Sequence, residues 1–242
     1  MPRFFLPEAP LEGETCVISG EDANHISRSL RMRVGERIVV AGGGYESETE
    51  IVRITSGEVY AVSLSRERCK SEPPFRYRLF QCLPKGDKFD EIIRKSVETG
   101  VCEITPVISS RVISRPEGGA AAVKAARWNR ISENAAMQCG RGAVPKVGLP
   151  VTFEGALADM RGGTAFFCWE NGGTPLPELL RELKPADRTV SFFVGAEGGI
   201  SEGEADALRA NGAAPVTLGR RILRCETCAP FVLACLSYAF EM

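Results

Sequence analysis

Three short, uninterrupted apolar runs in the C-terminal half constrain the fold of this chain more than any other feature. They read TAFFCW, TVSFFV and APVTL and begin at residues 164, 189 and 214. Continuous runs of this length are typical of strands that are buried on both faces of a parallel sheet. Upstream, YRLFQCL and EITPVIS alternate with the helical patterns KFDEIIRKSVETG and AAVKAARWNRISENAAMQCGR. This part of the chain is therefore expected to be an α/β domain whose sheet is parallel and covered on both faces.

The N-terminal part has a different pattern. Between residues 37 and 65, apolar and polar residues alternate, β-branched residues are frequent, and a glycine triplet and a Ser-Gly pair interrupt the alternation. This predicts a run of short antiparallel strands in a small β-barrel. The segment RCKSEPPF, residues 68–75, then changes the composition and contributes two prolines, as a linker does. We therefore expect two domains, residues 1–70 and residues 71–242.

Composition excludes several classes of function. No apolar run approaches the roughly 20 residues that span a bilayer, and MPRFFLPEAP lacks the pattern of a signal peptide, so we expect a cytoplasmic protein. The nine cysteines are an odd number and lie mostly in apolar segments, which indicates reduced, buried thiols. The pair Cys225 and Cys228 lacks a second CxxC, and the single histidine, His25, is distant in sequence. We therefore expect no metal site and no histidine-based catalytic triad.

The formal net charge of −1 conceals a basic region. Between Arg76 and Lys146 the chain carries thirteen Lys and Arg against seven Asp and Glu. Such an excess suits a polyanionic partner, but it also suits solvated helix faces, and charge alone does not distinguish the two. Trp128, within this region, has helical spacing with Ile131 and is expected in the core rather than as a platform for a base.

Ligands of parallel sheets bind at the carboxyl ends of the strands, and this rule selects three loops. They are CWENGG at residues 168–173, GAEGG at residues 195–199 and LGRRILRCET at residues 218–227. The middle loop lacks the Lys of a Walker loop and the spacing of a dinucleotide fingerprint, and Glu197 at its centre would repel a phosphate. We therefore expect this loop to meet a ligand that is not a polyphosphate, such as a cation.

The segments that follow the second and third loops carry helix signals. Ser201 and Glu204 have the spacing of a capping box. CAPFVLACLSYAF, from Cys228, is expected to be an apolar helix with a proline in its first turn. The third loop also gathers three arginines, at positions 220, 221 and 224, beside Glu226. This cluster suits an enzyme acting on nucleic acid, or equally a surface loop with a basic bias.

Several separated motifs resemble those of the SPOUT-class methyltransferases and, within that class, the bacterial 16S ribosomal RNA uridine-N3 methyltransferases. They are HISRSLRMRVGE, PKGDKFDEIIRKSVETGVCEITPV, RWNRISENAAMQCGR, FFVGAEGG and LGRRILRCET, which follow the family's order over nearly the whole chain. The chain departs from the usual family residue at five positions, each a small or apolar exchange: Ala196, Thr99, Cys139, Cys225 and Cys228. The charged residues of the motifs are unchanged. We therefore interpret the CxxC as the chance result of two independent exchanges.

The resemblance implies a PUA-like β-barrel that binds RNA, followed by a SPOUT methyltransferase domain whose C-terminal segment is threaded into a trefoil knot. It implies that S-adenosylmethionine binds in the knot and that the protein is a homodimer. The implied reaction transfers a methyl group to N3 of a specific uridine in the decoding region of 16S ribosomal RNA. A SPOUT enzyme with another ribosomal or transfer RNA target, and a noncatalytic RNA-binding protein on the same scaffold, remain as alternatives.

Roles for individual residues follow from the resemblance and from charge. Arg224 is expected to stabilise negative charge on the uracil, and Glu226 to receive the proton or orient the arginine, although this pair would also serve only to hold the knot together. The donor-binding residues are expected to be Cys168, Trp169, Glu170, Val194, Gly195, Glu197, Gly198, Leu218, Gly219, Ile222 and Leu223. The RNA contacts, with solvated surface charges as the alternative, are expected to be Arg28, Arg31, Arg33, Lys85, Lys95 and Arg141. The sequence leaves open whether the substrate is free RNA or an assembled subunit.

Overall fold

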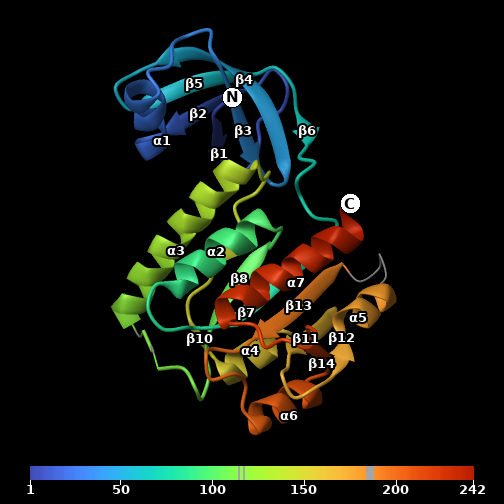
Figure 1. The fold of residues 1–242 in the computed structure, drawn as a ribbon. Helices are drawn as coiled ribbons and strands as arrows, with labels where there is room; N and C mark the ends of the chain where they lie inside the picture. Colours follow the sequence, from blue (N-terminus) through green and yellow to red (C-terminus); the bar gives the residue numbers. More distant parts are fainter. Residues whose placement is uncertain (114, 117, 184–187) are drawn as a thin grey trace. The chain divides into compact units, whose positions relative to one another are not determined.

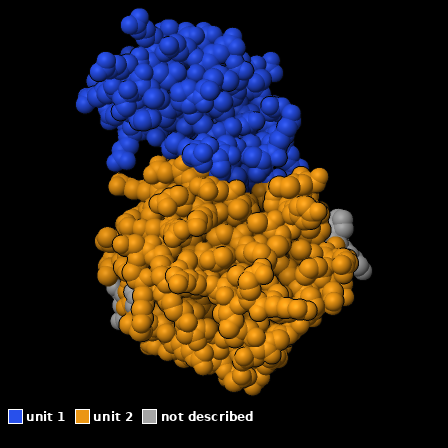
Figure 2. Space-filling model, viewed as in Figure 1, with its two compact units in different colours: residues 1–72, 136–144 blue, residues 73–135, 145–242 orange. Residues whose placement is uncertain are grey.

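The computed structural model describes residues 1–113, 115–116, 118–183 and 188–242. The chain divides into two compact units, which Figure 2 distinguishes by colour. Unit 1 contains residues 1–72 and 136–144, and unit 2 contains residues 73–135 and 145–242. The division expected from the sequence falls after residue 70. Residues 71, 72 and 136–144 therefore belong to unit 1 instead of to the second domain.

Unit 1 is built on a six-stranded mixed sheet with the order β1-β3-β4-β5-β2, in which β6 pairs with β4. Its strands are β1 (Arg3–Phe5), β2 (Thr15–Ser19), β3 (Arg37–Gly42), β4 (Tyr45–Ile54), β5 (Glu58–Ser63) and β6 (Glu67–Arg68). The β1–β3 ladder is parallel and the others are antiparallel, which confirms the antiparallel strands predicted between residues 37 and 65. Within the described part of the chain no ladder joins β1 to β2, so the expected barrel stays a prediction.

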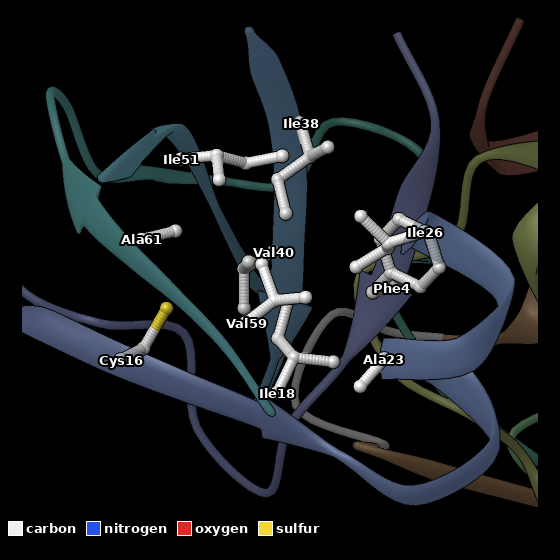
Figure 3. Packing of buried hydrophobic residues seen from close by; sticks show 10 residues of the cluster. All are labelled: Phe4, Cys16, Ile18, Ala23, Ile26, Ile38, Val40, Ile51, Val59 and Ala61. Carbon is white, nitrogen blue, oxygen red and sulfur yellow. The ribbon is translucent and has the colours of Figure 1, made fainter. Parts of the chain in front are cut away.

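The core of unit 1 arises from the strand alternation. In β2 the burial alternates along TCVIS, with Cys16 and Ile18 buried. Two short helical segments follow β2, α1 (Gly20–Asn24) and the π-helical turn η1 (His25–Ser29). Figure 3 shows Ile26 of this turn beside Phe4, within the same apolar cluster as Ile38 of β3. The period of two therefore covers one face of the sheet with a single apolar core.

Unit 2 is built on an eight-stranded sheet with the order β10-β8-β7-β13-β11-β14-β12, in which β9 pairs with β8. Its strands are β7 (Arg76–Cys82), β8 (Glu103–Ile108), β9 (Lys146–Val147), β10 (Val151–Thr152), β11 (Thr164–Cys168), β12 (Thr174–Pro175), β13 (Thr189–Val194) and β14 (Ala214–Thr217). Every ladder is parallel, so the prediction of a parallel sheet is confirmed. Strand β13 lies between β7 and β11, although β8 to β12 separate it from β7 in the chain.

Among the described residues of the chain, six helices accompany this sheet. They are α2 (Lys88–Glu98), α3 (Gly118–Cys139, which ends in unit 1), α4 (Phe153–Asp159), α5 (Leu176–Glu182), α6 (Glu202–Ala210) and α7 (Cys225–Phe240). Helix α7 packs against α2 and contacts β7 and β13 (Figure 1). Trp128 of α3 is buried, and its ring centroid lies 4.6 Å from that of Phe89 of α2. The prediction that Trp128 is a core residue is therefore confirmed.

Helix α7 begins three residues earlier than the sequence predicted, at Cys225 instead of Cys228. Arg224 is its N-cap residue, and the Arg224 carbonyl accepts hydrogen bonds from the N–H groups of Thr227 and Cys228 at 2.9 and 3.0 Å. Pro230 consequently lies in the second turn, where it cannot donate to the carbonyl of Glu226. The earlier start puts Glu226 in the first turn, where the helix dipole favours a negative charge.

Candidate functional site

A cavity of about 520 Å³ lies in unit 2 where β11, β13 and β14 end. All eleven residues expected to bind the donor line this cavity, as do Arg224 and Glu226. The eleven are Cys168, Trp169, Glu170, Val194, Gly195, Glu197, Gly198, Leu218, Gly219, Ile222 and Leu223. The structure thus brings the three loops together with the first turn of α7, while the roles of these residues remain predictions.

The loop after β13 is a tight turn that only glycine permits at two positions. Gly199 has a φ of +68° and donates its N–H to the Ala196 carbonyl at 2.9 Å. A Cβ on Gly195 would lie 2.8 Å from the carbonyl carbon of Gly199, closer than real contacts allow. Arg111 donates to the carbonyls of Gly198 and Ile200 from outside the turn. The backbone of this cavity wall is therefore fixed by its own packing.

The capping box predicted after the turn is confirmed. The Ser201 hydroxyl accepts from the N–H of Glu204 at 3.3 Å, and the Glu204 carboxylate accepts from the N–H of Ser201 at 2.9 Å. The second oxygen of Glu204 accepts from the N–H of Ser110, in the loop after β8, at 2.8 Å. Burial raises the pKa of Glu204, but these hydrogen bonds outweigh it and hold the pKa below its ordinary value. The charged Glu204 carboxylate thereby anchors the start of α6 beside the cavity.

Lys88 is a residue of the site that was not predicted from the sequence. Its Nζ lies 3.3 Å from Oε1 of Glu197 and 3.4 Å from Oε2 of Glu226. Burial raises the pKa of Glu197, but backbone N–H groups and Lys88 lower it by more. The pKa of Glu226 is lowered chiefly by its own backbone N–H; burial opposes this effect, and Cys225 and Lys88 lower the pKa further. Both carboxylates are therefore charged near neutral pH.

Arg224 does not pair with Glu226 in this structure. Within the described residues no ion pair joins the two, and Glu226 is paired with Lys88 instead. Arg220, Arg221 and Arg224 are all exposed along the rim of the cavity. A structural Arg224–Glu226 bridge, one of the alternatives considered from the sequence, is therefore absent, and the Arg224 guanidinium is available to a substrate.

Three cysteines, Cys168, Cys225 and Cys228, line the cavity, and the surroundings of Cys168 and Cys225 favour the neutral thiol. Burial, a hydrogen bond to Glu226 and nearby carboxylates raise the pKa of Cys225 to about 12. Contact with Cys228, followed by burial, raises the pKa of Cys168 well above its ordinary value. A nucleophile or metal ligand needs the thiolate. Among the described residues no group of three His, Cys, Asp or Glu side chains is suited to a metal ion.

The predicted RNA contacts fall in both units. In unit 1, Arg28, Arg31 and Arg33 are exposed, in η1 and the segment after it. Arg31 has a φ of +54° and is the only described non-glycine residue with a positive φ. In unit 2, Lys85 and Lys95 are exposed, and Lys95 forms an ion pair with Glu91 one turn away at 2.6 Å. These five side chains are accessible to a ligand.

Arg141 is a correction to the prediction. It is 3% exposed, and its Nε and Nη2 each lie 2.9 Å from a carboxylate oxygen of Glu72. Glu72 also accepts from the N–H groups of Gly142 and Ala143. Because this guanidinium is enclosed and engaged by a carboxylate in unit 1, it does not form a surface for RNA phosphates.

We expect Arg141→Met to lower the free energy of unfolding by about 3 kcal/mol, because the substitution leaves the Glu72 carboxylate, whose side chain is only 14% exposed, without its cation. Burial raises the pKa of Glu72, but Arg141 and two backbone N–H groups outweigh it, so the folded-state pKa lies below the unfolded value. The resulting stability is present above the unfolded pKa and is lost as pH falls through the folded one. Urea unfolding at neutral and acidic pH should therefore show a difference that shrinks in acid.

Arg28→Met serves as the matched control, since it removes the same charge from an exposed position of unit 1. Its stability is expected to stay within about 0.5 kcal/mol of the wild type. An Arg141→Met variant as stable as this control would contradict the structural role of the buried pair.

Comparison with known proteins agrees with this architecture. The family model described as RNA methyltransferase domain matches residues 71–237. A Bacillus subtilis protein named ribosomal RNA small subunit methyltransferase E is 28% identical over 252 residues, covering 100% of this chain and 98% of the relative. A Synechocystis protein with the same name is 29% identical over 238 residues, covering 97% and 76%. A crystal structure of ribosomal RNA small subunit methyltransferase E from Neisseria gonorrhoeae, bound to S-adenosyl methionine, is similar with 33% identity, coverage of 99% and 98%, and a TM-score of 0.87.

In the part of the chain that the structure describes, no helix is both long and apolar enough to cross a membrane.

Proposed function

The chain belongs to the RNA methyltransferase family, and we propose that it methylates the 16S RNA of the small ribosomal subunit with S-adenosylmethionine as donor. The relatives that carry the name ribosomal RNA small subunit methyltransferase E match this chain over nearly its whole length, and one of them was solved with the donor bound. The more specific proposal is that the acceptor is N3 of a uridine in the decoding region. This acceptor rests on the motifs that resemble the uridine-N3 enzymes.

The observation that carries the proposal is the cavity that three loops and the start of α7 form together. Its volume lies within the range of about 300–1,000 Å³ that is usual for cofactor sites. Its wall combines a glycine turn, apolar side chains such as Leu218 and Leu223, and the carboxylates of Glu170 and Glu197. The apolar part of this lining suits a flat apolar group, and Glu170 and Glu197 suit a positive charge, while Arg220, Arg221 and Arg224 of the same cavity suit a polyanion such as RNA.

S-adenosylmethionine supplies a methyl group on a positively charged sulfur, and the protein residues supply alignment and charge. Gly195, Glu197 and Gly198 would hold the donor from one side, and Leu218, Gly219, Ile222 and Leu223 from the other. Arg224, at the rim, would stabilise the negative charge that the uracil acquires when its N3 proton is lost to the surrounding water. Glu226, two residues from Arg224, would remain a fixed negative charge, because a lowered pKa makes this carboxylate a weak proton acceptor.

We also propose the trefoil knot, which would thread the segment after β14. Support comes from strand β13, which lies between β7 and β11, and from α7, which returns to pack on β7, β13 and α2. The proposed role of unit 1, a PUA-like barrel, is RNA binding through Arg28, Arg31 and Arg33, with Lys85 and Lys95 as contacts from unit 2. A ribosomal RNA substrate implies that the protein works in the cytoplasm.

A homodimer is the proposed assembly. On α7, Phe231 and Tyr238 lie two helical turns apart, both are exposed, and Tyr238 is 76% exposed. Met242 at the end of the chain is exposed in the same way. An apolar stripe of this kind on the helix that begins at the cavity supports a second subunit packing there. Sedimentation of the wild type and of a Phe231→Glu, Tyr238→Glu variant would measure the assembly.

Two measurements test the proposed activity. Isothermal titration of the protein with S-adenosylmethionine is expected to give one site per chain, and no binding would contradict the donor assignment. Methyl transfer is then measured on small ribosomal subunits, free 16S RNA and transfer RNA, with the product nucleoside identified by mass spectrometry. We expect 3-methyluridine in 16S RNA. A methylated ribose or a transfer RNA product would support the alternative target, and binding of RNA without any methylation would support the noncatalytic alternative.

A further inference from the structure

We propose that Lys88 is a positioning residue that ties the loop after β13 to the first turn of α7 and thereby leaves Arg224 free for the RNA. The inference rests on the proposed methyl transfer. Lys88 is the first residue of α2, and it lines the same cavity as Glu197, Glu226 and Arg224. Strand β7, which precedes α2, is next to β13 in the sheet. The loop after β7 and the loop after β13 therefore leave the sheet at the same edge.

The first contact joins the start of α2 to the middle donor loop. Oε1 of Glu197 accepts a hydrogen bond from the N–H of Lys85 at 3.0 Å and lies 3.3 Å from Nζ of Lys88. One carboxylate oxygen is thus held by a backbone group and by a charge from the same short segment. Glu197 therefore faces α2, and the turn that contains Gly195 and Gly198 is fixed on that side.

The second contact joins Lys88 to the first turn of α7. Its Nζ lies 3.4 Å from Oε2 of Glu226, in the first turn of α7, and Arg224 precedes Glu226 by two residues as the N-cap. If Lys88 were removed, Glu226 would remain charged and would lack its ion-pair partner. Arg224, two residues before it, has no ion pair among the described residues. Pairing between Glu226 and Arg224 would then compete with the RNA for the arginine.

The charge environment argues against Lys88 as a phosphate contact. Its side chain is 37% exposed, and two carboxylates already lie within ion-pair distance of its single ammonium group. A phosphate at Lys88 would also meet both carboxylates. Lys85 and Lys95 are exposed on either side of it in the sequence, and neither is paired with two acids within the described residues. Lys88 therefore acts through Glu197 and Glu226 rather than on the substrate.

The test is a double-mutant cycle on full-length protein, with steady-state methyl transfer to small ribosomal subunits and with titration of S-adenosylmethionine. The variants are Lys88→Met, Lys88→Gln, Glu226→Gln and the double variant Lys88→Met, Glu226→Gln. We expect Lys88→Met to lower kcat by about 10-fold or more in the wild-type background. In the Glu226→Gln background the same substitution should change kcat by no more than about twofold, because the carboxylate that would otherwise compete for Arg224 is gone, while the remaining contact with Glu197 is measured by the titration of S-adenosylmethionine.

Two further variants separate charge from side-chain loss. Lys88→Arg keeps the cation and is expected to restore kcat to near that of the wild type. Lys124→Met, which removes a lysine from an exposed position of α3, is the matched control and should retain wild-type kcat. If Lys88→Met does not fold, as judged by circular dichroism and thermal unfolding, Lys88→Gln replaces it in the cycle.

The outcomes distinguish this inference from the proposed function. If the wild type methylates the subunits while Lys88→Met or Lys88→Gln keeps its kcat, the inference alone is overturned. The same holds if the kcat losses of Lys88→Met and Glu226→Gln are additive, since an additive loss means an independent role. A wild type that binds no donor and methylates no RNA would overturn the proposed function and this inference together.

Discussion

Arg224→Ala is expected to lower kcat/KM for methyl transfer to small ribosomal subunits by about 100- to 1,000-fold, the range seen when a single group that stabilises developing charge is removed. Arg224 lines the cavity, is exposed and has no ion pair within the described residues, so its charge is available to the uracil. Because the substitution removes charge that matters only when the uracil loses its proton, the Kd for S-adenosylmethionine should change little. Steady-state kinetics and isothermal titration measure the two quantities separately.

Two matched variants sharpen this expectation. Arg224→Lys keeps a positive charge but loses the planar fork of the guanidinium, and its activity should lie between those of alanine and the wild type. Arg94→Ala removes an arginine from an exposed position of α2 and should leave kcat/KM unchanged. An Arg224→Ala enzyme with wild-type activity would remove the catalytic assignment, while the family membership of the chain would stand.

The cavity could be outlined from the sequence because parallel strands end at a common edge. Each of the runs TAFFCW, TVSFFV and APVTL is a strand of one parallel sheet, and the loops that follow them meet at one cavity. Periodicity alone is sufficient for this step, since it identifies the strands and thus the ends at which ligands bind. The order of the strands was not needed to bring these loops together.

Lys88 was missed because its role depends on strand order. The strand before it, β7, is far in sequence from β13 and from α7, and only the insertion of β13 beside β7 brings their loops together. The same limit applies to Arg141, which was read as part of a basic surface. Its partner Glu72 lies 69 residues away, and no local pattern relates the two. Long-range ion pairs of this kind are set by the fold rather than by spacing.

The two helix starts near the cavity differ in their sequence signals for a physical reason. Helix α6 begins after Ser201, whose hydroxyl caps the helix, and this start was predicted correctly. Helix α7 begins after Arg224, which makes no side-chain capping hydrogen bond, so no residue type marks the position. Its proline then suggested a start that lies three residues too late. An arginine at the N-cap therefore gives no sequence signal for the boundary of this helix.

Gly195→Ala is expected to weaken binding of S-adenosylmethionine by about 10- to 100-fold, because overpacking of this kind costs roughly 1–3 kcal/mol. The new Cβ would lie 2.8 Å from the carbonyl carbon and 3.1 Å from the carbonyl oxygen of Gly199, both backbone atoms of the same turn. The turn would have to open, which displaces Glu197 and Gly198 on the cavity wall. Isothermal titration measures whether the strain weakens donor binding, and thermal unfolding measures whether it lowers the stability of the protein.

Gly203→Ala is the matched control for this loop. Gly203 lies in the first turn of α6, a Cβ there meets no atom within 4 Å, and the substitution should stabilise the helix by about 0.5–1 kcal/mol. If Gly195→Ala melted at a lower temperature but bound the donor as tightly as Gly203→Ala, the turn would matter for folding alone. Weaker binding with little change in melting temperature would instead mean that the backbone of this turn, and not only its side chains, shapes the donor site.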